Sequence, residues 1–135
     1  MFPATARLET VYRASAYVVR WAGRDVVLRI GTPPPRLPWG AWRQACVVTA
    51  CNPNSRPRAA AANRRAARRL EAALRRRGVR ALPAEGRGDA GDWPPEPGLL
   101  VFGLPSRSAA ALGRRLRQNA ILRVGRRAVL LVPLA

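Results

Sequence analysis

Acidic side chains that could act as a catalytic pair gather in one segment of the chain. Four of the seven acidic residues fall within positions 85–96, namely Glu85, Asp89, Asp92 and Glu96. Paired carboxylates can bind Mg²⁺ or serve as a general acid and a general base. They can instead form ion pairs with arginines, and neither an Asp-x-Asp nor a Glu-x-x-His pattern accompanies them. We therefore favour ion pairing, and expect no metal and no cofactor.

Amide side chains form a second candidate group. Asn63 lies about 20° from Leu70 on a helical wheel, within the apolar stripe of an expected helix. A buried amide without partners costs on the order of 1 to 3 kcal/mol, so we expect Asn63 to bond the turn at residues 49–55. Gln118 and Asn119 follow the second expected helix. These amides either tie loops to helix ends or orient a ligand at one edge of the fold.

Two residue types are absent from the chain, and their absence removes several reactions. The sequence has no His and no Lys, so all 25 cationic residues are arginines, against 7 acidic residues, for a net charge of +18. A histidine general base, a Ser-His-Asp triad, a His-ligated metal and a Schiff-base lysine are therefore excluded. Because few catalytic groups are left, we expect a binding protein rather than an enzyme.

Arginine dominates one face of the expected helix at 59–77. With Leu70 at the centre of the buried stripe, most of its cations fall on the opposite side. The residues expected to contact nucleic acid are Arg64, Arg65, Arg68, Arg69, Arg75 and Arg76, joined by Arg114 and Arg117 from the second helix. Guanidinium groups bind phosphate oxygens bidentately and stack on bases, so RNA or the ribosome is the expected partner. The alternative is a solvated face in a proteome whose codons favour arginine.

The order of the expected elements indicates an α+β fold in a single domain over residues 1–135. Segments 10–21 and 25–30 predict a first hairpin, and segments 120–124 and 128–132 predict a closing one. Between them, strands are expected at 46–50, 79–83 and 99–104, helices at 59–77 and 106–117 with Ser106 as a cap, and a loop at 85–98. This order predicts a ferredoxin-like (split βαβ) two-layer sandwich with added N-terminal and C-terminal β-hairpins.

The cellular location is suggested by the N-terminus and the cysteines. Residues 1–13 lack the apolar stretch of a signal peptide, and the longest apolar run, at 128–132, is too short to cross a bilayer. Cys46 and Cys51 lie within and just after one expected strand and point to opposite faces, so we expect two reduced thiols. These features predict a cytoplasmic protein with no membrane partner.

Short motifs occur along most of the chain: Thr10-Val11-Tyr12, Leu28-Arg29-Ile30-Gly31, Thr49-Ala50-Cys51-Asn52-Pro53-Asn54-Ser55, Asn63, Trp93-Pro94-Pro95-Glu96-Pro97 and Gln118-Asn119-Ala120. Together they resemble the DUF3293 family of uncharacterised small bacterial proteins. The resemblance covers about residues 10–132 and implies no activity, and the family usually has Gly where Arg117 stands. It does imply a polar set that meets in space, consisting of Arg29, Thr49, Asn52, Ser55, Asn63, Trp93, Glu96, Gln118 and Asn119.

Two functional hypotheses follow from the sequence. The first is a nonenzymatic protein that contacts nucleic acid through the arginine face of segment 59–77. The second is a small-ligand-binding or enzymatic domain built on the polar set, with Glu96 as acid or base, Arg29 as anion clamp and the amides as orienting groups. The second hypothesis requires that the polar side chains share a cavity.

Overall fold

The computed structural model describes residues 9–34, 44–91 and 94–134. Residues 9–13 are helical. The elements that follow are β1 (Ser15–Trp21), β2 (Arg24–Leu28), β3 (Ala45–Val48), the short 3₁₀ helix η1 (Pro53–Ser55), α2 (Ala60–Arg76), β4 (Ala81–Gly88), β5 (Glu96–Phe102), α3 (Ser106–Arg115), β6 (Ala120–Val124) and β7 (Val129–Pro133). The fold is α+β, as the sequence predicts. None of the described helices is long and apolar enough to span a membrane.

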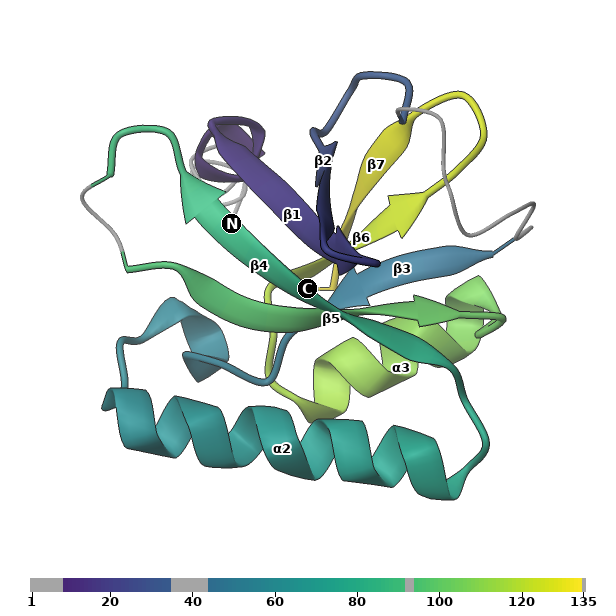
Figure 1. Ribbon diagram of the computed structural model, residues 1–135. Coiled ribbons are helices and arrows are strands. Elements are labelled where there is room, and N and C mark those ends of the chain that lie inside the picture. Colours follow the sequence, from purple (N-terminus) through teal and green to yellow (C-terminus); the bar gives the residue numbers. More distant parts are fainter. Residues whose placement is uncertain (1–8, 35–43, 92–93, 135) are drawn as a thin grey trace.

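The seven strands form one antiparallel sheet in the order β2-β1-β4-β5-β3-β6-β7. Helix α2 connects β3 to β4, and α3 connects β5 to β6. In each connection the two joined strands are separated by one other strand of the sheet. Both helices pack against the same face of the sheet, where they form a layer of their own (Figure 1).

The sheet curls until its two edges meet. Ile30, just beyond β2, forms a parallel bridge with Val129 at the start of β7. The Gly31 N–H donates to the Val129 carbonyl at 2.8 Å, and the Val129 N–H donates to the Thr32 carbonyl at 3.1 Å. Curling gives the sheet a convex face, which the helices cover, and a concave face, which encloses a core of its own.

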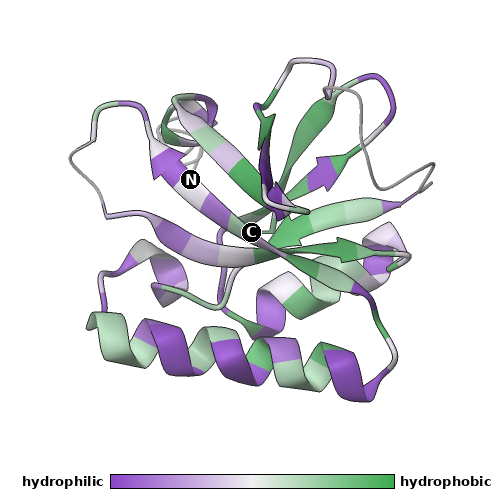
Figure 2. Cartoon of the chain, in the orientation of Figure 1, coloured by the Kyte–Doolittle hydropathy of each residue, from purple (hydrophilic) through white to green (hydrophobic). Residues whose placement is uncertain are grey.

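Alternation along the strands separates these two cores. In β3, Val47 lies in the concave core, whereas Cys46 and Val48 lie in the core beneath the helices, together with Leu70 and Leu74 of α2. Figure 2 shows hydrophobic residues along the strands and alternating hydrophilic and hydrophobic bands along α2. This banding is the pattern of a helix with one buried face and one solvent face.

Both helices end in a Schellman motif, which favours glycine at its left-handed position. In α2, the Gly78 N–H bonds the Arg75 carbonyl and the Val79 N–H bonds the Leu74 carbonyl, each at 3.0 Å, and Gly78 has φ 71°. The predicted helix at 59–77, ended by Gly78, is thereby confirmed to within one residue at each end.

The N-terminal segment differs from its prediction, because residues 10–14 do not belong to the first strand. Residues 9–13 form a short helix in which the Ala14 N–H donates to the Thr10 carbonyl at 3.0 Å. Glu9 accepts a hydrogen bond from Arg13 at 3.1 Å, an i,i+4 pair that suits a helix. These local contacts outweigh the strand preference of the Val and Tyr side chains.

Two further local predictions are wrong. The expected loop at 85–98 is strand at both of its ends, because β4 continues to Gly88 by pairing with β1, and β5 begins at Glu96. Ser106 does not cap α3 but is its first residue; Pro105 occupies the N-cap position without a side-chain hydrogen bond.

Candidate functional site

A cavity of about 520 Å³ lies on the concave face of the sheet, at the end where β3 and β4 finish and β1, β5 and β6 begin. The strand register brings these ends together, since Ser15 of β1 pairs with Gly88 of β4, and Gly86 of β4 pairs with Glu96 of β5. Val11, from the N-terminal helical segment, also lines the cavity. The volume suits a small organic molecule, and the mouth of a barrel-like sheet is a common place for one.

The cavity exists because the concave face carries small side chains at this end. Leu28, Leu100 and Phe102 fill the rest of the concave core. Small residues stand around the cavity: Ser15, Thr49, Gly86, Gly88, Gly98 and Ala120. A Cβ placed at Gly88 would meet no heavy atom within 4 Å. The empty space therefore follows directly from the missing side-chain volume.

Two tyrosines line the cavity together with a carboxylate. They are Tyr12, from the N-terminal helical segment, and Tyr17 of β1, and the carboxylate is that of Glu96. Burial raises the pKa of Tyr12 to about 12, with a contribution from the Glu96 charge. Burial likewise raises the pKa of Tyr17, and Tyr12 and Glu96 add to the effect. Both phenols are therefore neutral at physiological pH.

Asn63 of α2 does not line the cavity, but its side chain holds Asn52, which does. Its Oδ1 accepts the Asn52 backbone N–H at 3.0 Å, and its Nδ2 donates to the Asn52 Oδ1 at 2.9 Å. Asn52 lines the cavity and has φ 46° and ψ 60°, a left-handed backbone that asparagine tolerates well. The Arg58 N–H donates to the same Asn52 Oδ1 at 2.9 Å. The prediction that Asn63 bonds the turn at 49–55 is confirmed.

Thr49 and Gln118 are tied to the loop that follows β3. The Thr49 hydroxyl donates to the Pro97 carbonyl at 2.8 Å and accepts the Cys51 N–H at 3.0 Å, while the Gln118 Nε2 donates to the Cys51 carbonyl at 2.9 Å.

The thiols of Cys46 and Cys51 are free and buried, as expected. Burial raises the pKa of Cys46 to about 12 and also raises the pKa of Cys51. Both thiols therefore stay protonated and are poor nucleophiles.

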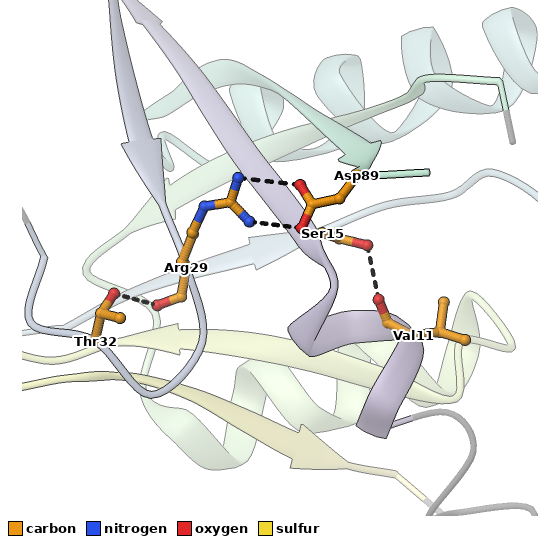
Figure 3. Close-up of polar contacts among 5 residues, drawn as sticks. All are labelled: Val11, Ser15, Arg29, Thr32 and Asp89. Atoms are coloured by element: carbon orange, nitrogen blue, oxygen red, sulfur yellow. Dashed lines mark hydrogen bonds and ion pairs between the residues drawn. The ribbon is translucent and has the colours of Figure 1, made fainter. Parts of the chain in front are cut away.

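An arginine–carboxylate pair lies at the edge of the cavity. Arg29 donates from both Nη atoms to the two carboxylate oxygens of Asp89, each at 3.0 Å (Figure 3). These bonds lower the pKa of Asp89 and raise that of Arg29. Asp89 lines the cavity and its N–H donates to the Ala14 carbonyl at 2.9 Å, whereas Arg29 does not line the cavity. The guanidinium expected to act as an anion clamp is thus engaged with a carboxylate of the chain itself.

The acidic segment divides between ion pairs and the cavity. Glu85 pairs with Arg87 at 3.2 Å, and Asp89 pairs with Arg29 as described, so the expected ion pairing is confirmed for these two acids. Asp92 lies outside the described residues. Within the described ranges, no group of three or more His, Cys, Asp or Glu side chains is arranged to hold a metal ion.

The structure brings part of the predicted polar set together. Thr49, Asn52, Glu96 and Gln118 line the cavity. Asn63 bonds Asn52, Arg29 bonds Asp89, and Asn119 lies beside Gln118 with its carbonyl accepting the Leu134 N–H at 3.0 Å. Trp93 and the side chain of Ser55 lie outside the described part of the chain.

One half of the cavity wall is not predicted from the sequence. Tyr17, Gly86 and Gly88 were not candidates, and Tyr12 was assigned to a strand. The Gly-x-Gly at 86–88 is the signal that could have indicated the space, because alternate strand positions face the same side and two glycines leave that side empty.

The predicted arginine face lies on the solvent side of α2. All six of its arginines there, Arg64, Arg65, Arg68, Arg69, Arg75 and Arg76, are exposed. Among the described residues, only Arg75 of these six forms an ion pair, with Glu71 at 3.0 Å. At 1.5 Å per residue, the 17 residues of α2 extend about 25 Å. The helix therefore presents a long, positively charged face, and few acidic side chains of the described residues pair with its arginines.

Arg117→Gly is expected to stabilise the fold by up to about 1 kcal/mol. Arg117 occupies the left-handed position of the α3 Schellman motif with φ 56°, where Gly78 serves in α2. The substitution relieves backbone strain in the folded state. We expect this gain in free energy to exceed the cost of the conformational entropy that glycine adds to the unfolded chain. The urea midpoint should rise. The matched variant Arg68→Gly, within α2, should lose about 1 kcal/mol, and a lower midpoint for both variants would contradict the assignment of strain.

Residues 48–121, more than half of the chain, match the model of a family described as "Protein of unknown function (DUF3293)". Comparison with curated proteins and with solved structures finds no match. The matched span includes α2 and the polar cavity residues Thr49, Asn52, Glu96 and Gln118. It excludes the two tyrosines of the cavity wall.

Proposed function

We infer that this chain, a member of the DUF3293 family, is a small-molecule-binding domain whose site is the cavity at the open end of the curled sheet. The observation that carries the proposal is the meeting of four predicted polar residues, contributed by three separate segments, at one cavity of about 520 Å³. Sites for small ligands combine an apolar wall with a few convergent polar groups. Here Tyr12, Tyr17 and Leu122 supply apolar wall, and Asn52 and Gln118 supply amides.

We propose binding without chemical turnover. The chain has neither His nor Lys, and its two thiols are buried and protonated. Glu96 is the one cavity residue that we would assign as an acid or base if a reaction occurs. Buried free thiols suit a reducing compartment, which supports a cytoplasmic location.

The architecture that holds this site is proposed to be a ferredoxin-like core extended at both ends. The support is the strand order β4-β5-β3-β6, in which two strand–helix–strand units interleave with antiparallel neighbours. β1 and β2 extend one edge and β7 extends the other.

Gly88→Phe is expected to block the site while leaving the fold intact. The new side chain would enter open space on the concave face, because nothing lies within 4 Å of its Cβ and Gly88 lines the cavity. Indole, a neutral aromatic probe, should shift the backbone amide resonances of Tyr17 and Leu122 in the natural chain. Its affinity for the variant should fall at least tenfold.

Arg87→Phe provides the matched control, since Arg87 is exposed and neighbours Gly88 on the same strand without lining the cavity. This variant should bind indole as the natural chain does. Equal loss in both variants, or shifts that spare the cavity residues, would contradict the proposed site.

A second candidate function is favoured by a different observation. The exposed arginine face of α2, with Arg75 as its only ion-paired member among the described residues, suits the phosphate backbone of RNA. Guanidinium groups in two rows along a helix can contact successive phosphates without reading bases. We propose that this face contacts RNA or the ribosome with weak sequence preference.

A further inference from the structure

We propose that the ligand of the cavity is a small organic cation, an amine or ammonium group carried on an aromatic or aliphatic body. The inference rests on the proposed function and names its ligand class. It is carried by two features of the cavity, its charge and its aromatic wall, and the hydrogen bonds of Thr49 and Gln118 agree with them.

The cavity is lined by acidic residues, although the chain as a whole is strongly basic. Arginines outnumber acidic residues 25 to 7, yet the described lining residues include Glu85, Asp89 and Glu96 and no arginine. Three of the seven carboxylates therefore face one cavity. Two of them are compensated at the rim by Arg87 and Arg29. Glu96 lines the cavity as well, and its charge contributes to the raised pKa of both tyrosines.

Two hydrogen-bond donors of the wall, Thr49 and Gln118, are committed to the protein itself. The Thr49 hydroxyl donates to the Pro97 carbonyl, and the Gln118 Nε2 donates to the Cys51 and Leu116 carbonyls. The oxygen of the Gln118 amide can still accept, as can carboxylate oxygens. At these two positions the wall therefore favours a ligand group that supplies N–H donors.

The aromatic wall suits a positive charge. Tyr12 and Tyr17 line the cavity as neutral phenols, and the face of a neutral phenol ring attracts an ammonium group. The attraction is greater where the cation is partly desolvated, as it is inside a cavity. An aromatic wall beside Glu96 combines the two groups that recognise organic ammonium ions.

Other ligand classes fit this wall less well. An anion would lose hydration while facing carboxylates, which is unfavourable. A bare metal ion needs several oxygen ligands at short range, and the described residues contain no such group. The apolar wall would also contribute nothing to a bare ion.

The test compares three probes that share an indole ring and differ in charge: tryptamine, tryptophol and indole-3-acetate. Their affinities for the full chain are measured by NMR titration, following the amides of cavity residues. Tryptamine should bind at least tenfold more tightly than tryptophol, and indole-3-acetate should bind most weakly. Glu96→Gln should reduce the preference for tryptamine over tryptophol to less than threefold without weakening tryptophol. Glu71→Gln, a control on the solvent face of α2, should leave all three affinities unchanged.

The outcomes separate the ligand class from the site. Equal binding of the three probes at the cavity, or a preference for indole-3-acetate, would overturn the cationic ligand and leave small-molecule binding in place. An unchanged tryptamine preference in Glu96→Gln would also overturn it. Binding of none of the probes, with indole itself failing in the natural chain, would overturn the site and the ligand class together.

Discussion

Reversal of four arginines on α2 to glutamate, at Arg64, Arg65, Arg68 and Arg69, is expected to lower the affinity for single-stranded RNA by at least about a hundredfold. Each phosphate contact on a single strand contributes about 0.7 to the slope of log affinity against log salt. The loss of four contacts should therefore reduce that slope by about 3. Fluorescence anisotropy with a labelled oligouridylate, measured between low and high salt, gives both quantities.

A matched variant separates the helical face from the overall charge. Arg24, Arg123, Arg126 and Arg127 are exposed residues of β2, of β6 and of the turn after β6, and their reversal changes the net charge equally. This control should retain most of the affinity and slope. If the two variants lose affinity to the same extent, net charge alone explains the binding, and the α2 face has no special role.

Asn63→Ala is expected to cost about 2 kcal/mol of unfolding free energy. The substitution removes the acceptor of the Asn52 N–H and a donor to the Asn52 Oδ1, in a half-buried region. Unpaired polar groups there cost about 1 to 3 kcal/mol, which exceeds the gain in helix propensity from alanine. Urea denaturation measures the loss, and faster hydrogen exchange at the Asn52 amide should accompany it.

Glu71→Ala tests whether the loss at Asn63 is specific. Glu71 lies on the same helix and makes an exposed i,i+4 pair with Arg75, so its removal should cost no more than about 0.5 kcal/mol. A cost at Asn63 as small as that at Glu71 would mean that the amide network contributes little to the fold. In that case Asn52 would be held by the other bonds of its loop.

Local patterns predicted the elements that local contacts stabilise. The helix at 59–77 was recognised from apolar spacing and from Gly78, because both act within a few residues of the chain. The first hairpin is predicted with its turn at 22–24 for the same reason, and the structure shortens that turn to Ala22 and Gly23, both of which have the positive φ that a two-residue turn requires. The partners of the Asn63 side chain are also local, since they lie eleven positions or fewer away.

Pairing between distant segments determines the elements for which the local sequence predicts the wrong structure. Gly86 and Gly88 predict the start of a loop at 85–88, because glycine disfavours strands. They are strand because β1, some seventy residues earlier, supplies hydrogen-bond partners along their length. The N-terminal turn at 9–13 was misassigned for the opposite reason, since its Val and Tyr have strand preferences that short-range helical contacts outweigh.

The sequence by itself determined the chemistry available to this protein: arginine as its only cation, no histidine or lysine, and a polar set that includes Asn52, Glu96 and Gln118. These are properties of composition and short-range order, which folding does not alter. Only the tertiary structure decided that these side chains share a cavity. The cavity arises where a curled sheet brings five strand ends together and their concave positions lack side-chain volume. The space depends on which distant strands become neighbours, and pairing over such separations leaves little trace in the local sequence.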